Sequence, residues 1–186
     1  MPERYIKRIL DGDKEAFRFI IGECQDAAYN LSISILKDDM LAKEAIQKAF
    51  IRAYEKLHTF KHRSTFKTWF HRIVVNEAFQ LSRKSKNNRN SPHNLPANYE
   101  SSKNEIQKGI DENHMQHYVH QALDVMKPNE CLSLRLFYLE EHSIEEIIDI
   151  TGWSKSNVKV TLHRARKSMK TILSEKFNMK PEELYL

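Results

Sequence analysis

The sequence lacks any apolar run long enough to cross a membrane. A membrane-spanning helix needs roughly 18 or more apolar residues in succession, and no window approaches that composition. The first residues, Met1–Phe17, also lack the apolar core of a secretory signal peptide. We therefore expect a cytoplasmic protein that does not insert directly into a membrane.

Glycine, cysteine and strand-like patterns are scarce as well. The 186 residues include four glycines and two cysteines, and apolar and polar residues do not alternate as they do in half-buried strands. Cys24 and Cys131 each lie within an apolar helical pattern, so we expect reduced core residues rather than a disulfide. These absences predict an all-α chain.

Motifs for catalysis are missing too. There is no glycine-rich phosphate loop and no Gly-x-Ser-x-Gly nucleophile elbow. Histidines do recur at helical spacing, at His58 and His62 and again at His114, His117 and His120. A metal site needs a full ligand set with supporting partners, which these histidines lack. We expect no metal, no cofactor and no enzyme, and keep a metal-dependent hydrolase as the chemical alternative.

Positive charge is present and clustered. The formal net charge is +5, yet the stretch Phe60–Lys86 alone carries seven cations against one acid, Glu77. The same stretch places Phe66, Trp69 and Phe70 at helical spacing. Cations beside aromatic rings suit single-stranded nucleic acid, which needs its phosphates neutralised and surfaces on which its bases stack. The alternative is a core helix with a solvated basic face.

The pattern divides the chain into two helical domains. In the first, residues 1–84, a helix from about Met40 to Leu57 buries alanines, and Phe50 is either a docking anchor or a core residue. A third helix, capped by Ser64 or Thr65, runs to about Arg83. Residues 85–111 are rich in Asn, Ser, Pro and Lys, which predicts a flexible linker. The second domain covers residues 112–173, and residues 174–186 form a tail of unassigned role.

The second domain carries a helix-turn-helix pattern. Ser143 and Glu146 form a capping box, Gly152 can end that short helix, and Ser154 can cap a longer one. From Ser154 to Lys176 there are seven cations and one acid, as a helix lying between two phosphate rows requires. The alternatives are a plain helical hairpin and, for the protein as a whole, a free-standing helix-turn-helix regulator.

Three stretches in this order resemble a bacterial sigma factor of the extracytoplasmic-function (ECF) class: Ala42–Phe50 (AKEAIQKAF), Phe66–Asn76 (FKTWFHRIVVN) and Val158–Arg166. The resemblance extends from Gly12 to about Met169. The family usually has an aspartate where Lys48 stands, and often one where Ala45 stands, so this helix is less acidic than usual.

The resemblance implies a factor that directs core RNA polymerase to specific promoters for transcription initiation. The first domain would resemble sigma region 2 and capture the melted −10 element, including one flipped base. The residues implied are Lys61, His62, Arg63, Ser64, Thr65, Phe66, Lys67, Arg72, Asn76, Arg83 and Lys84. The same domain would dock on the clamp coiled coil of the polymerase β′ subunit through Asp39, Glu44, Gln47 and Phe50.

The second domain would resemble sigma region 4, read the −35 element in double-stranded DNA and contact the β-subunit flap. The residues implied for DNA are Lys155, Ser156, Lys159, Val160, His163, Arg164 and Arg166. The family is often held inactive by an anti-sigma factor, commonly membrane-anchored, which the resemblance therefore implies as a further partner.

Overall fold

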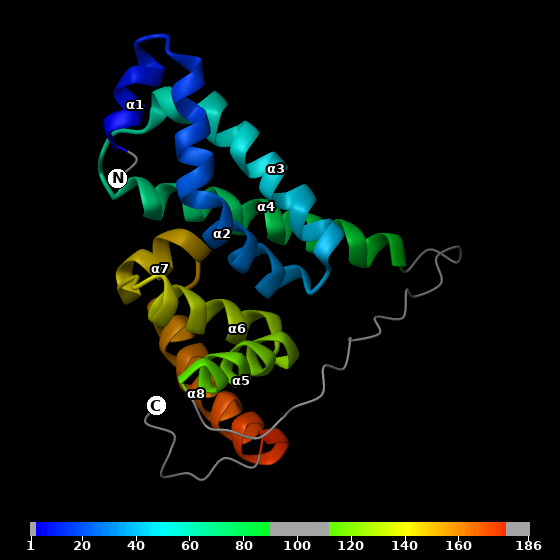
Figure 1. Ribbon diagram of the computed structural model, residues 1–186. Coiled ribbons are helices and arrows are strands. Elements are labelled where there is room, and N and C mark those ends of the chain that lie inside the picture. The colour runs from blue at the N-terminus through cyan, green and yellow to red at the C-terminus, as the bar shows by residue number, and fades with distance from the viewer. Residues whose placement is uncertain (1–2, 90–111, 178–186) are drawn as a thin grey trace.

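The computed structural model describes residues 3–89 and 112–177, and within these ranges the chain is helical with no strand (Figure 1). The predicted all-α class is therefore confirmed. No helix in the two described ranges is long and apolar enough to cross a membrane.

The first domain is a bundle of α2 (Phe17–Leu36), α3 (Asp39–Lys56) and α4 (Phe66–Arg89), which pack against one another. The short α1 (Glu3–Leu10), which the sequence did not lead us to expect, packs against α2. Lys37 ends α2 in the left-handed conformation (φ 52°), and the Asp38 carboxylate then accepts a hydrogen bond from the Leu41 backbone N–H at 3.0 Å. This cap fixes the start of α3 at Asp39, one residue before the predicted start at Met40.

The second domain contains α5 (Glu112–Val125), α6 (Pro128–Leu134), a π-helical turn (Arg135–Leu139), α7 (Ile144–Thr151) and α8 (Lys155–Phe177). Ser143 and Glu146 form the predicted capping box, with the Ser143 N–H donating to the Glu146 carboxylate at 3.0 Å. Gly152 ends α7 at φ 72°, a conformation that favours glycine. The helix-turn-helix prediction is confirmed.

Two helices are longer than we predicted. The third helix of the first domain, α4, continues to Arg89, so residues 85–89 are helical rather than linker. The last helix, α8, continues to Phe177, four residues into the predicted tail. The remainder of the predicted linker, residues 90–111, and of the tail, residues 178–186, lies outside the described residues.

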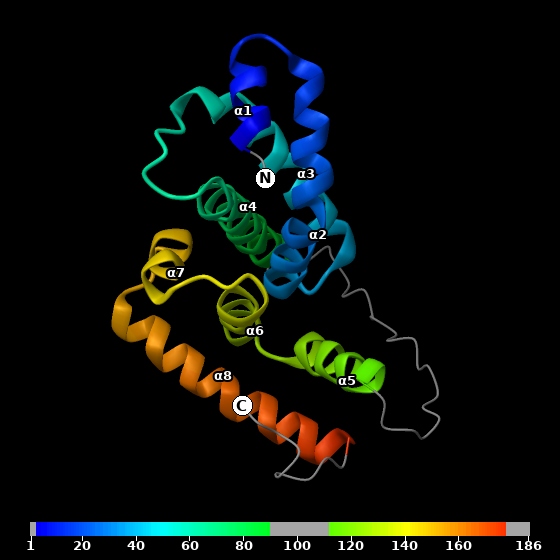
Figure 2. The same ribbon diagram turned by 60° about the vertical axis from the view of Figure 1, so that its left-hand side comes forward.

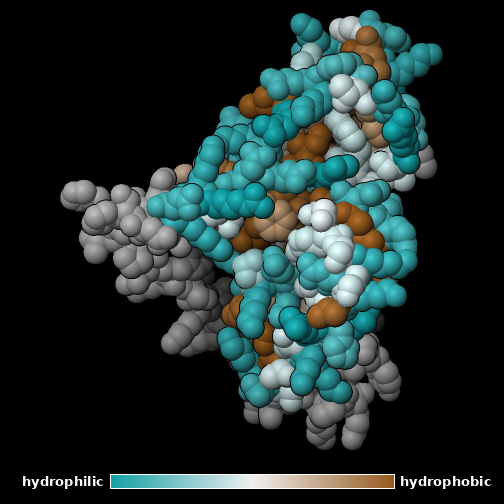
Figure 3. Space-filling model, turned by 180° about the vertical axis from the view of Figure 1, so that it is seen from behind, coloured by the Kyte–Doolittle hydropathy of each residue, from teal (hydrophilic) through white to brown (hydrophobic). Residues whose placement is uncertain are grey.

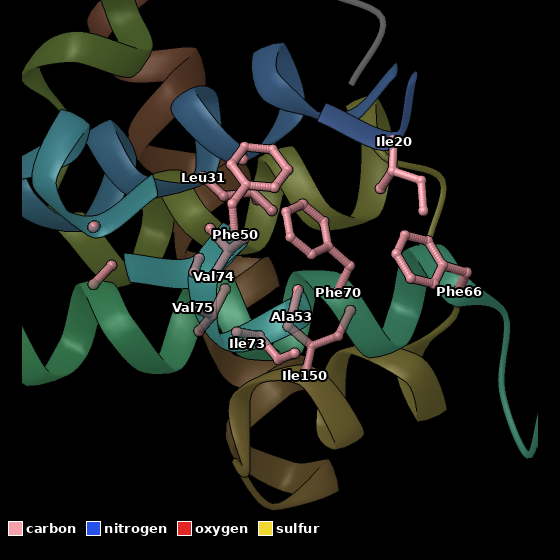
Figure 4. Packing of buried hydrophobic residues seen from close by; sticks show 14 of the residues in the cluster. Ile20, Leu31, Phe50, Ala53, Phe66, Phe70, Ile73, Val74, Val75 and Ile150 are labelled. Carbon is pink, nitrogen blue, oxygen red and sulfur yellow. The ribbon is translucent and has the colours of Figure 1, made fainter. Parts of the chain in front are cut away.

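The two domains lie against each other, with α7 packed on α4 and α6 on α2 (Figure 2). One apolar cluster spans this junction: Phe50, Phe70 and Ile73 of the first domain share it with Ile150 of α7 (Figure 4). A second cluster, centred on Leu123 and Leu173, lies wholly within the second domain. Seen from behind, the surface is mainly hydrophilic, with its hydrophobic residues mostly toward the middle (Figure 3).

Candidate nucleic-acid interface

The loop from Lys61 to Thr65 packs on aromatic side chains of the first domain. Lys61, His62 and Arg63 are exposed, and the His62 ring lies 4.5 Å from the Phe60 ring, centroid to centroid. Thr65 caps α4, because its hydroxyl accepts a hydrogen bond from the Thr68 N–H at 3.1 Å. The cations of the loop are therefore held in solvent at the amino-terminal end of α4.

One face of α4 carries the polar groups expected to hold a DNA strand. Arg72, Asn76 and Arg83 are exposed and follow Thr65 at helical spacing, so they form a single row that starts at the loop. Lys84 is exposed beside the end of this row. A row of donors that runs along one helix suits the regularly spaced phosphates of a single strand.

Phe66 does not belong to this surface. It is completely buried, and its ring packs against those of Phe60 (5.8 Å), Trp69 (5.5 Å) and Phe70 (6.0 Å). Burying an aromatic ring in the core stabilises the fold more than leaving the ring exposed, and residue 66 faces the interior of the bundle. The prediction that Phe66 contacts a flipped base is therefore wrong, because its ring supports the loop from below.

Lys67 points toward the second domain. It is therefore not part of the row formed by Arg72, Asn76 and Arg83, which we call the Arg72 row. Its Nζ lies 3.0 Å from the Glu140 carboxylate and donates a hydrogen bond to the Glu140 backbone carbonyl at 2.8 Å. Thr68 beside it donates from its hydroxyl to the Glu146 carboxylate at 2.7 Å. The structure thus separates Lys67 from the other predicted −10 contacts.

The recognition face on α8 is continuous and open to solvent. Its members are exposed and fall three or four residues apart, the spacing that places side chains on one side of a helix: Lys155, Ser156, Lys159, Val160, His163 and Arg164. The Lys155 Nζ lies 2.9 Å from the Glu145 carboxylate, and this contact lowers the pKa of Glu145. A positively charged, exposed helix after a tight turn is the arrangement that enters a major groove.

Arg166 follows His163 by three residues on the same side of α8, but its side chain packs on the π-helical turn. Its Nε donates to the Tyr138 hydroxyl at 2.7 Å, and its guanidinium lies over the rings of Phe137 and Tyr138. Cation–π contact with two rings holds the side chain on the π-helical turn. Arg166 therefore joins α8 to Arg135–Leu139, and its contact with DNA phosphates stays a prediction.

The α3 surface predicted to dock on polymerase differs from expectation at one residue. Glu44 and Gln47 are exposed, and Asp39 is half-buried, but Phe50 is 8% exposed and stacks on Phe70 with 5.0 Å between ring centroids. The pKa of Asp39 is lowered by hydrogen bonds from Lys43 and from Tyr29. Phe50 is a core residue, so it cannot be the docking anchor.

Three apolar residues that we did not select from the sequence occupy that surface. Met40, Ile51 and Tyr54 are 75%, 53% and 38% exposed, and with Glu44 and Gln47 they form one stripe along α3. The signal was present in the spacing, because the alanines that α3 buries mark the opposite face. Exposed apolar side chains among polar ones are typical of a protein-binding surface.

The histidines do not assemble into a metal site in the described residues. No group of three His, Cys, Asp or Glu side chains there could hold a metal ion. Both cysteines are free, with Cys131 buried and Cys24 half-buried, as expected.

Known proteins match this chain in both domains. The sigma-70 region 2 family model matches residues 20–88, and the sigma-70 region 4 model matches residues 109–169, which together are more than two thirds of the chain. RNA polymerase sigma factor SigV of Bacillus subtilis is 28% identical over 147 residues, covering 79% of this chain and 84% of SigV. ECF RNA polymerase sigma factor SigM of the same organism is 27% identical over 150 residues, covering 81% of this chain and 90% of SigM.

Two solved structures share the fold. Sigma factor RpoE of Bartonella quintana, in complex with the anti-sigma factor NepR, superposes with a TM-score of 0.66 at 18% identity and covers 86% of this chain and 97% of its own. CnrH, in complex with the cytosolic domain of CnrY, gives a TM-score of 0.61 at 18% identity and covers 91% of this chain and 95% of its own.

Proposed function

This chain belongs to the ECF sigma factors, and we propose that it brings core RNA polymerase to promoters by binding two DNA elements with two separate surfaces. The observation that carries the proposal is the pair of open basic faces on α4 and α8, each in the domain whose family model matches. Two such faces on separate domains suit a bipartite promoter better than a single site.

The α8 face would read the −35 element in double-stranded DNA. Lys159, Val160, His163 and Arg164 stand at the centre of the face and would contact base edges. Lys155 and Ser156 near the start of α8 would contact phosphates, which position the helix without reading sequence.

The loop and the Arg72 row would hold the melted −10 strand. Lys61, Arg63, Arg72 and Arg83 neutralise phosphates, and Asn76 offers an amide that can both donate to and accept from a base edge. Taking a base out of the stack costs a few kcal/mol, which new stacking and hydrogen bonds must offset. The buried Phe66 keeps the loop in place for this purpose.

The stripe on α3 would bind the clamp coiled coil of the polymerase β′ subunit, and the second domain would contact the β flap. The stripe combines the apolar Met40, Ile51 and Tyr54 with Glu44 and Gln47, a mixture suited to a helix of another protein. The protein would act in the cytoplasm as a non-catalytic subunit. An anti-sigma factor, of the kind bound to the similar RpoE structure, would restrain it.

Two alternatives from the sequence find less support. A free-standing helix-turn-helix regulator leaves the region 2 match and the Arg72 row without a role. A metal-dependent hydrolase would need a cluster of metal ligands, and the described ranges contain none. The relatives of this chain are transcription factors. Run-off transcription with core polymerase on genomic fragments tests the proposal. Starts at defined positions, dependent on this protein, support it, and the absence of any such start refutes it.

A further inference from the structure

A cavity of about 340 Å³ lies between the last turns of α4 and the start of α6. The end of α2 and the start of α3 complete its walls, and these elements lie close together in Figures 1 and 2. Cavities that hold a small molecule begin at about 300 Å³. Among the lining residues, only Arg83 belongs to a surface described above, so the cavity has no role yet.

Three cations line this cavity, and none of its lining residues is acidic: Lys37, Arg83 and Lys86. None of the three forms an ion pair with another described residue, whereas Lys43 and Arg52 of the same domain each pair with a carboxylate. Like charges around one cavity repel one another, and an anion within the cavity would relieve that repulsion. The charge pattern therefore points to an anionic ligand.

The two acids that follow Lys37 in the sequence are already engaged. Asp38 caps α3, and the Asp39 carboxylate lies 2.8 Å from the Lys43 Nζ. Lys37 itself donates to the Leu123 backbone carbonyl at 2.7 Å, and its ammonium group has further N–H donors to offer. The positive charge around the cavity is therefore not neutralised by carboxylates of the described residues.

The α4 wall combines hydrogen-bond donors with an aromatic ring. Phe79, Ser82 and Ser85 follow one another in steps of three residues, so they share one face of the helix. All three are half-buried, and neither serine hydroxyl is hydrogen-bonded to another described residue. Ile35 of α2 and Leu41 of α3 add apolar surface. The cavity thus offers apolar contact next to free donors and cations.

We propose that this cavity binds a nucleotide, with the phosphate groups on Arg83 and Lys86 and the base against Phe79. The planar guanidinium of an arginine matches two phosphate oxygens, and a lysine ammonium adds a point charge. The flat base needs apolar contact, which an aromatic ring supplies. A purely apolar ligand would leave the cations without a partner, and a simple inorganic anion would leave the apolar surface in contact with water.

A phosphate of the melted −10 strand has the same chemistry, because Arg83 belongs both to this cavity and to the Arg72 row. A free nucleotide suits the cavity better, since α6 of the second domain forms one wall and the volume corresponds to one small molecule. A nucleotide on Arg83 would compete with the strand for that side chain. Only this competition rests on the proposed function.

Titration calorimetry on the full-length chain, without polymerase or promoter, tests the site. The probes are ADP, GDP, the two free nucleosides, inorganic phosphate and a single-stranded DNA oligonucleotide. We expect ADP or GDP to bind at a single site. The matching nucleoside and inorganic phosphate should each bind at least about tenfold more weakly, because each keeps only part of the contacts.

Lys86→Gln removes one cation of the cavity, and Lys84→Gln is its matched control. Both lysines are exposed near the end of α4, but only Lys86 lines the cavity. Because the two positions are exposed, neither change should unfold the domain. We expect Lys86→Gln to weaken nucleotide binding by about tenfold and Lys84→Gln to leave it unchanged.

The inference fails if neither nucleotide binds to the unmodified chain, or if the two variants have equal affinities. Inorganic phosphate that binds as tightly as the nucleotide would indicate an adventitious ion only, and would also overturn it. Binding of the oligonucleotide but of neither nucleotide, with the same loss in Lys86→Gln, would assign the cavity to the DNA backbone instead. Since these titrations contain no polymerase, their outcome is separate from that of run-off transcription.

Discussion

The imidazole of His71 on α4 lies against that of His142 before α7, with 2.8 Å between His71 Nδ1 and His142 Nε2. Both side chains are buried at the junction of the domains. Glu140 lies 4.0 Å from the other nitrogen of His71, and Glu146 lies 3.7 Å from the other nitrogen of His142. The hydrogen bond between the rings needs one acceptor nitrogen, so at least one imidazole must be neutral.

This pair makes stability fall in mild acid. Burial lowers the pKa of His71 to about 3, with His142 and Lys67 adding to the effect, and burial also lowers the pKa of His142. Below pH 6.5 the unfolded chain binds protons that the folded chain does not, so stability is full above pH 6.5 and decreases as pH falls toward 3. From pH 7.5 to 5.5 we expect His71 alone to remove about 1.4 kcal/mol from the free energy of unfolding. Chemical denaturation at the two pH values measures this difference.

The control for that experiment is His71→Gln, which cannot take up the proton. The variant should show a smaller change between pH 7.5 and 5.5, whatever its absolute stability. Below that range Glu146 acts in the same direction. Burial raises its pKa, but hydrogen bonds from Thr68 and Ser143 outweigh burial and bring the pKa to about 2, so its contribution is lost as pH falls below about 4.5. An unchanged pH dependence in His71→Gln would contradict the assignment.

Substitutions at Phe70 and at Asn76 should affect different properties, the stability of the fold at Phe70 and DNA binding at Asn76. Phe70 is completely buried, and truncating a buried Phe to Ala costs about 3–5 kcal/mol, so Phe70→Ala should lower the unfolding free energy by that order. Asn76 is exposed, and Asn76→Ala should change stability by less than about 0.5 kcal/mol while weakening open-complex formation. Denaturation curves and transcription rates measured on both variants check this division. A large stability loss in Asn76→Ala would contradict it.

Lys159 and Arg166 should differ in the salt dependence of duplex binding. Lys159 is exposed on the recognition face, whereas Arg166 is bound to Tyr138. If Lys159 contacts a phosphate, Lys159→Ala should reduce the slope of log K against log salt by about 0.9. If Lys159 reads a base, the variant should instead relax the −35 preference by about 1–3 kcal/mol. Arg166→Ala should leave both quantities unchanged, and a reduced slope in that variant would confirm the predicted contact of Arg166 with phosphates.

Ile51 should contribute to polymerase binding. It is 53% exposed on the α3 stripe, and Leu10 on α1 is 52% exposed outside the stripe, so the same change to Ser at each position removes a similar side chain. We expect Ile51→Ser to weaken binding to core polymerase by about tenfold, which corresponds to about 1.4 kcal/mol, and Leu10→Ser to leave it unchanged. Titration of labelled protein with core polymerase measures both, and equal affinities would remove the stripe from the interface.

Local chemistry made much of the fold predictable. The Ser143 capping box and the Gly152 turn depend on neighbouring residues, so the sequence predicts α7 and its junction with α8 closely. Phe50 and Phe66 were misassigned because helical spacing places a residue near the edge of the buried stripe without saying which side it takes. Both rings lie in the aromatic core, where each packs against Phe70.

Contacts between distant segments could not be predicted. Lys67 and Glu140 are 73 residues apart, and nothing in the local pattern of either residue indicates the other. The basic stretch around Lys67 therefore suggested that all its cations face DNA. The structure divides them, because Arg72 lies on an open face while Lys67 meets the second domain. The closure of the two domains is a property of the folded chain that helix patterns alone do not contain.

The most direct test of bipartite promoter capture is site-specific crosslinking on a promoter identified by run-off transcription. A photoreactive amino acid replaces Asn76 in one variant and Lys159 in another, each in complex with core polymerase. We predict that position 76 crosslinks to the non-template strand near −10 only when polymerase is present, and that position 159 crosslinks to duplex DNA near −35. Crosslinking of position 76 to duplex DNA without polymerase, or of neither position to the promoter, would contradict the account.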